Sequence, residues 1–393
     1  MMRSLLFVFL LVLATGSACA IPQFSALTGN RCSNCHVAPS GGGLRNELGW
    51  YSWYDVCIVP NDLGAIKWMT SGDSPNQFFG GLLTLGMDLR LQTARAFTEG
   101  AERKYFPMQA ALYAALTPVK AVTIEGSFNL AALRQGPNTD TRIVYPGQRI
   151  GAYSVLFQPD ITWPTFRVGL MRPSIGSRYD DHTMASYSYS TATTRQTYLA
   201  PDWSEYGAEI TYEGMRWLTL QAGVFGSEGL SQMQLSNGVQ GGSAITGNSP
   251  TVSARAVYWD RFADDLINTS VGASVLVNND FSMVSTFASV GWSDHASLMM
   301  DYTITNKSNV ITSRNFMAEL MYQVLSAASV YVRYERYFTD QTQAPGTVNA
   351  NAVVLGSQLF VLPYVELRPE YRIWDTYKEG ASTRWAVQLH IFF

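Results

Sequence analysis

The sequence predicts an all-β fold: a transmembrane antiparallel β-barrel of about sixteen strands, with a small N-terminal segment that plugs the lumen. Three observations predict it. Apolar and polar side chains alternate in successive segments of residues 78–393. The connections between these segments are either very short or long, and the last segment has an apolar or aromatic side chain at every second position.

The alternation is regular in residues 84–92, 122–130 and 316–324. In the first of these segments the apolar side chains are those of Leu85, Met87, Leu89 and Leu91. A strand with one apolar and one polar face also suits a soluble β-sandwich, so the alternation alone does not identify a barrel.

The lengths of the connections favour a membrane barrel. Residues 117–120 and 159–164 form short connections, whereas residues 134–148 and 177–204 form long ones. Barrels of the outer membrane have short periplasmic turns and longer extracellular loops. An even number of strands places the start of the barrel on the same side as its end, so we expect the N-terminal segment at the periplasmic mouth.

The C-terminal residues support the same fold. Within residues 364–374 the charged side chains of Glu366, Arg368, Glu370 and Arg372 share one face, opposite Val365, Leu367, Tyr371 and Ile373, which suits the wall of an aqueous lumen. The end of the chain resembles the strand by which outer-membrane barrels are recognised for assembly, with Trp385, Val387, Leu389, Ile391 and Phe393 at alternate positions. The sequence predicts no membrane-spanning helix, so only a closed barrel would span the bilayer.

Residues 1–20 predict a secretory signal peptide. They have a basic start, a short apolar run and small residues at Ala18 and Ala20, so the mature chain would begin near Ile21. Cleavage before Cys19 with lipid attachment is the alternative. The formal net charge is −3 with 15% charged residues and no basic cluster, so we expect no nucleic-acid partner.

Residues 21–77 carry the motif Cys32-Ser33-Asn34-Cys35-His36. In an exported chain this spacing indicates one covalently attached haem c, because two thiols add to the haem vinyl groups and the next histidine ligates the iron. A redox or disulfide pair is the other interpretation, but such a pair does not need His36. A segment this short usually needs a bound cofactor to fold, so haem would supply its core.

Other haem contacts are less determined. Met69 is the candidate second axial ligand within the segment, and Arg45 is the candidate partner of a haem propionate. Met69 could instead be a packing residue, and Arg45 could be solvated. The aromatic residues 50–54 could cover the porphyrin or pack in a core. Cys57 is a third thiol with no predicted role.

An export signal, one Cys-x-x-Cys-His motif and a porin-sized barrel in one chain resemble the fused cytochrome-porin family of outer-membrane electron-transfer proteins. The residues before the motif also resemble that family, at Pro22, Phe24, Ala26, Thr28 and Gly29. Residues 40–45 depart from the pattern of its iron-oxidising members.

The resemblance implies a location in the outer membrane of a double-membraned bacterium, in contact with outer-membrane lipid. It implies that single electrons pass through a haem in the lumen, from an extracellular donor to a periplasmic c-type cytochrome or another electron carrier. If the donor is Fe(II), the protein is an Fe(II):cytochrome c oxidoreductase. Two alternatives remain: a solute-conducting porin with a structural or regulatory haem, and a haem enzyme with an open iron site.

The long connection 177–204 has two interpretations. Asp180, Asp181 and His182 could contact a donor Fe(II), because carboxylates and imidazole are suitable ligands, although such residues also occur in ordinary turns. Alternatively the connection folds into the pore as a constriction.

Overall fold

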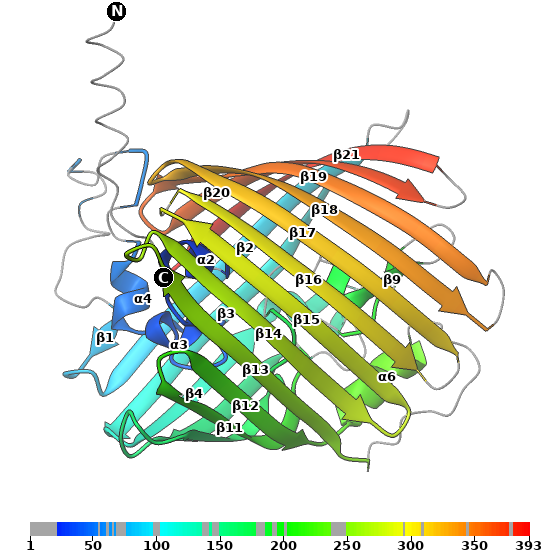
Figure 1. The fold of residues 1–393 in the computed structure, drawn as a ribbon. Helices are drawn as coiled ribbons and strands as arrows, with labels where there is room; N and C mark the ends of the chain where they lie inside the picture. Colours follow the sequence, from blue (N-terminus) through cyan, green and yellow to red (C-terminus); the bar gives the residue numbers. More distant parts are fainter. Residues whose placement is uncertain are drawn as a thin grey trace, which may run out of the picture.

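The computed structural model of the chain describes most of residues 22–393 (Figure 1). The described residues are 22–53, 56–59, 63–64, 67, 76–96, 103–135, 141–143, 149–177, 185–190, 195–199, 203–236, 249–293, 295–307, 310–342, 346–376 and 380–393. The predicted signal peptide lies outside them.

Sixteen antiparallel strands form a closed barrel, as the sequence predicts. They are β2 (Leu83–Ala96), β3 (Lys104–Val119), β4 (Val122–Asn129), β7 (Gly151–Phe157), β8 (Thr165–Met171), β11 (Glu205–Met215), β12 (Leu218–Phe225), β13 (Thr251–Phe262), β14 (Ile267–Asn278), β15 (Phe281–Trp292), β16 (Ala296–Lys307), β17 (Ile311–Leu325), β18 (Ala328–Gln341), β19 (Thr347–Leu362), β20 (Val365–Thr376) and β21 (Gly380–Phe392). Each strand pairs with the next, and the last strand pairs with the first, from Asp88↔Phe392 to Ala96↔Arg384. The ring therefore has no open edge, as a sheet in a bilayer requires.

The two faces of the strands differ as the alternation predicts. Along β14 and β16, buried polar residues such as Ser274 and Asp301 alternate with exposed apolar ones such as Val271 and Leu298. The outer face is thus apolar and the inner face polar, the pattern of a barrel in lipid with a polar lumen. Among the described residues, no helix has the length and hydropathy to cross a membrane.

The predicted strands agree closely with the structure, with one local difference. Residues 84–92, 316–324 and 364–374 lie in or at the start of β2, β17 and β20. β4 ends one residue earlier than predicted, because the Asn129 side chain accepts hydrogen bonds from the backbone N–H groups of Ala110 and Ala131, each at 3.0 Å, and a 3-10 turn η1 (Leu130–Ala132) follows.

In the described part of the chain before the barrel, three short helices pack against the inner wall near the end where the chain terminates (Figure 1). They are α2 (Pro22–Thr28), α3 (Cys32–Cys35) and α4 (Glu47–Tyr51), and we call residues 22–53 the plug. An aromatic cluster fixes the plug to the wall: the Trp53 ring lies 4.4 Å from Phe360, 5.1 Å from Phe24 and 5.5 Å from Phe392, centroid to centroid. A short strand β1 (Gln77–Phe78) then pairs with β2.

A second inward-facing element follows β8. The turn η2 (Ala185–Tyr187) and the strands β9 (Ser188–Ser190) and β10 (Arg195–Thr197) lie against the inner wall, where the buried Asn315 side chain donates to the carbonyls of Ala185 at 2.8 Å and Ser188 at 2.5 Å. The described part of connection 177–204 therefore folds into the lumen. This agrees with the interpretation in which the connection folds into the pore. The remaining elements are β5 (Leu133–Gln135), β6 (Thr141–Ile143) and α6 (Glu228–Ser236).

Candidate functional site

The Cys-x-x-Cys-His motif forms one turn of helix followed by a tight hairpin. The His36 N–H donates to the Cys32 carbonyl at 3.0 Å, which closes the turn. His36 then pairs with Arg45 in an antiparallel bridge, and the Asn46 N–H donates to the Cys35 carbonyl at 3.0 Å. The motif is therefore held by backbone hydrogen bonds on both sides.

Glycines make this hairpin possible. Gly41, Gly42 and Gly43 all have positive φ, between 66° and 78°, which side chains other than glycine adopt at a cost. A Cβ on Gly41 would lie 2.8 Å from the Cys32 Cβ, and a Cβ on Gly49 only 2.0 Å from the Cys35 carbonyl oxygen. Residues 40–45 thus fold back over the cysteines, with no room for larger side chains at these two points.

Cys32, Cys35 and His36 all line one cavity between the plug and the inner wall of the barrel. Its volume is about 250 Å³, slightly below the roughly 300–1,000 Å³ of pockets for drug-sized ligands. Cys35 and His36 are buried, and the two cysteines are not joined by a disulfide.

The wall of the cavity carries more basic than acidic side chains. The arginines that line it are Arg31, Arg45, Arg90, Arg149, Arg167 and Arg172, against the carboxylates of Asp88 and Glu125. Glu125 is paired with Arg167, and Asp88 with Arg45 at 3.3 Å. The cavity is therefore suited to an anionic ligand.

Arg45 connects the plug to the part of the barrel wall where the last strand β21 pairs with the first strand β2, next to β20. Its guanidinium lies 4.4 Å from the Phe392 ring centroid and pairs with Asp88, while its buried Nε has no hydrogen-bond partner. The ring nitrogens of His390 lie 3.0 Å from Asp88 and 3.0 Å from Glu366. His390 therefore links the carboxylates of β2 and β20.

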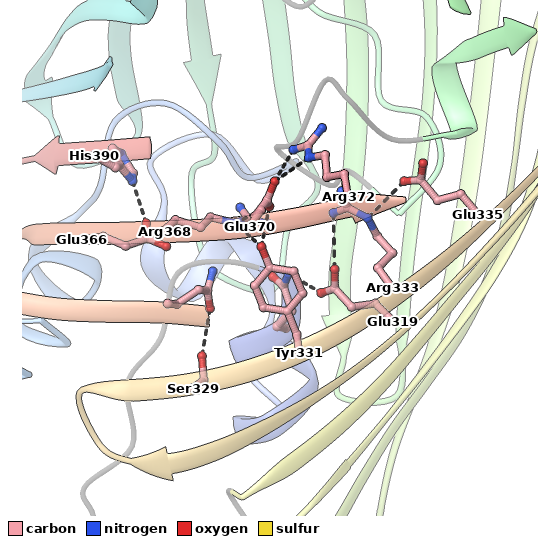
Figure 2. Close-up of polar contacts among 12 residues, drawn as sticks. Glu319, Ser329, Tyr331, Arg333, Glu335, Glu366, Arg368, Glu370, Arg372 and His390 are labelled. Carbon is pink, nitrogen blue, oxygen red and sulfur yellow. Dashed lines mark hydrogen bonds and ion pairs between the residues drawn. The ribbon is translucent and has the colours of Figure 1, made fainter. Parts of the chain in front are cut away.

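Figure 2 shows a second charged network on the inner wall. Arg333, which is 0% exposed, lies between Glu319 at 3.4 Å and Glu335 at 3.0 Å. Gln23 of the plug donates to Glu319 at 2.7 Å, so this network contacts α2 directly. Nearby, Glu370 accepts from Tyr331 and Arg372 (Figure 2). The predicted charge ladder of β20 thus faces inward.

The residues present fit a covalently attached haem. Cys32, Cys35 and His36 all line one cavity, and that cavity has six arginines against two carboxylates. Arg45 Nε is a buried donor that a propionate oxygen would satisfy. The aromatic residues Trp50 and Trp53 do not line the cavity. They pack against Tyr364 and Phe360 on the wall, so the structure favours core packing over a porphyrin cover for these side chains.

Several candidate residues cannot be placed. Met69, Asp180, Asp181 and His182 lie outside the described residues. The sequence did not single out Met171, Arg149 and Arg172 as cavity residues, because alternation predicts which face of a strand is inward but not which positions along the barrel lie at one depth.

No protein-family model matches the chain, and no curated protein does. Solved structures match by fold. The high-pH structure of OprB from Pseudomonas putida has a TM-score of 0.54 at 10% identity, over 86% of this chain and 98% of that one. An anion-selective porin from Comamonas acidovorans gives 0.52 at 12% identity, over 79% and 99%. The outer membrane channel DcaP of Acinetobacter baumannii gives 0.50 at 10% identity, over 79% and 97%.

These similarities show a porin-like fold, as the predicted architecture requires. Together with the closed ring and the apolar outer face, they identify the chain as an outer-membrane β-barrel, with membrane lipid around it. The haem and the electron partners stay predictions.

Proposed function

We propose that this protein is an outer-membrane electron conduit, in which a single haem c is held inside a porin-like barrel. The observation that carries the proposal is that Cys32, Cys35 and His36 line one cavity between the plug and the lumen wall. A haem attached at this motif would lie inside the barrel, where it could carry electrons along the lumen.

The chain would hold the cofactor with its own residues. Cys32 and Cys35 would form thioether bonds to the porphyrin, and His36 would ligate the iron. Arg45 and the other cavity arginines would neutralise the propionates. When bound, the haem supplies reversible one-electron chemistry at its iron, and the protein supplies its position and its electrostatic surroundings.

The position inside the barrel matters because the apolar band of an outer membrane is about 25 Å thick. Electron tunnelling falls off exponentially with distance, so a redox centre partway along the lumen shortens both steps. The plug and the folded-in connection both occupy parts of the lumen. They favour electron passage over free diffusion of solutes.

The donor would be extracellular and the acceptor a periplasmic c-type cytochrome or a similar carrier. The resemblance to iron-oxidising cytochrome-porins makes Fe(II) the first donor to test. Asp180, Asp181 and His182 stay the candidate contacts for that ion.

The test is electron transfer across sealed vesicles. Purified haem-loaded protein is inserted into liposomes that enclose oxidised cytochrome c, and a membrane-impermeant reductant is added outside. We expect reduction of the enclosed cytochrome with the wild type and with Cys57→Ser, and none with Cys35→Ser. Equal rates for all three, or no reduction with the haem-loaded wild type, would refute the conduit.

A second candidate is a solute-conducting porin whose haem is structural or regulatory. The observations that favour it are the fold shared with channels and the excess of arginines in the cavity, which suits small anions. Single-channel recording separates the two candidates. A conduit predicts a small conductance in the haem-loaded protein, whereas a porin predicts sustained ion flow that prefers anions.

A further inference from the structure

We propose that Met171 is the second axial ligand of the haem iron, opposite His36. This inference rests on the proposed function, because it assumes that the cavity holds the haem. It assigns a role to a residue outside the Cys-x-x-Cys-His segment, on the last position of strand β8.

The residues that line the cavity limit the candidates for the second iron ligand. The second ligand of an electron-transferring c-type haem is a methionine sulfur or a histidine nitrogen. Among the described residues that line the cavity with His36, only Met171 and His390 offer one.

His390 is committed elsewhere. Its two ring nitrogens each lie 3.0 Å from a carboxylate oxygen, one on Asp88 and one on Glu366. Ligating iron would break one of these two contacts, and the side chains of Asp88 and Glu366 are only 5% and 7% exposed. Asp88 would keep its pairing with Arg45, but a buried carboxylate that loses a hydrogen-bonded partner is destabilised.

Met171, unlike His390, would give up no contact with a buried carboxylate. It is 1% exposed, yet it does not belong to the apolar clusters in which the buried Met283, Met299 and Met317 pack. It lies instead on the wall of an arginine-rich cavity. Its backbone is fixed by pairing with Glu205 on β11, so the side chain projects from a rigid strand.

A methionine opposite His36 would have two consequences. The iron would be six-coordinate, without the open position that a peroxidatic enzyme needs. The reduction potential would be higher than that of a haem with two histidine ligands. Both consequences suit a one-electron carrier.

The test compares spectra and potentials of the full-length, haem-loaded protein with those of three variants. Met171→Leu removes the sulfur and keeps the side-chain volume. Met69→Leu tests the candidate ligand that the sequence offers within residues 21–77, and Met283→Leu is a control for loss of a buried methionine elsewhere. Covalent haem is confirmed by peptide mass in each, and heat-modifiable migration confirms the folded barrel.

We expect the wild type to show the near-infrared charge-transfer band of methionine-ligated ferric haem. Met171→Leu should abolish the band and lower the potential, while Met69→Leu and Met283→Leu should keep both. Loss of the band in Met69→Leu alone, or a wild type without it, would overturn the assignment of Met171 and leave the conduit standing. A wild type that carries no covalent haem would instead refute the proposed function itself.

Discussion

The plug should undock from the inner wall of the barrel more often when Trp53 is replaced by alanine. The Trp53 side chain is 2% exposed and contacts Phe24 within the plug and Phe360 and Phe392 on the wall. It is therefore the main apolar link between the two parts. Trp53→Ala removes this link and leaves the strands of the barrel unchanged.

The magnitude follows from the burial of the ring. Truncating a buried tryptophan or phenylalanine to alanine costs about 3–5 kcal/mol. Since each 1.4 kcal/mol is a tenfold change in an equilibrium constant, the undocked fraction should rise about 100- to 4,000-fold. The hydrogen bond from Gln23 to Glu319 and the contacts of Arg45 remain in this variant, so undocking should be transient.

The assay is single-channel recording in planar bilayers. We expect rare, large openings in Trp53→Ala that are absent from the wild type. Trp217→Ala is the matched control, because Trp217 is 49% exposed in the turn between β11 and β12. Records of Trp53→Ala that cannot be distinguished from those of Trp217→Ala would show that the plug is not held by this cluster.

Three further substitutions test other parts of the account. Gly49→Ala places a Cβ 2.0 Å from the Cys35 carbonyl oxygen. We expect it to lower the folding stability by the upper end of about 1–3 kcal/mol and to lower the haem content per barrel. The control Gly64→Ala, whose Cβ would meet nothing within 4 Å, should change neither quantity. Glu319→Ala leaves a wholly buried arginine with one carboxylate instead of two, and should destabilise the barrel by about 3 kcal/mol in denaturant titrations; an unchanged midpoint would contradict the buried pairing. Val271→Arg puts a charge on the lipid face and should cost about 2–4 kcal/mol in folding into vesicles, unless that face is not in contact with lipid.

The sequence predicts the barrel well because the lumen and the lipid impose opposite demands on neighbouring residues. In β20 the alternation of Glu366 and Glu370 with apolar residues already assigns each side chain to a face, and the structure confirms that both carboxylates face inward. The predicted end of a strand is wrong where a side chain, instead of a backbone carbonyl, accepts the hydrogen bonds of nearby backbone N–H groups. Asn129 ends β4 in this way, and no periodicity signals it.

The cavity is harder to predict than the motif. The spacing of Cys32, Cys35 and His36 is a local property of the chain, whereas the wall opposite them is built from strands that are distant in sequence. Met171 reaches that wall because β8 pairs with β11 at a given register, with Glu205 opposite Met171. A one-residue shift in this register would place Met171 on the other face, so its role follows from the pairing and not from its local sequence.

The central claim is that one haem is attached to the plug inside the lumen. Its most direct test is mass spectrometry of proteolytic peptides from the mature protein, purified from outer membranes of cells that can attach haem c. The account predicts that the peptide with residues 32–36 carries one haem, bound to Cys32 and Cys35. An unmodified peptide, or one in which the two cysteines form a disulfide, would contradict it.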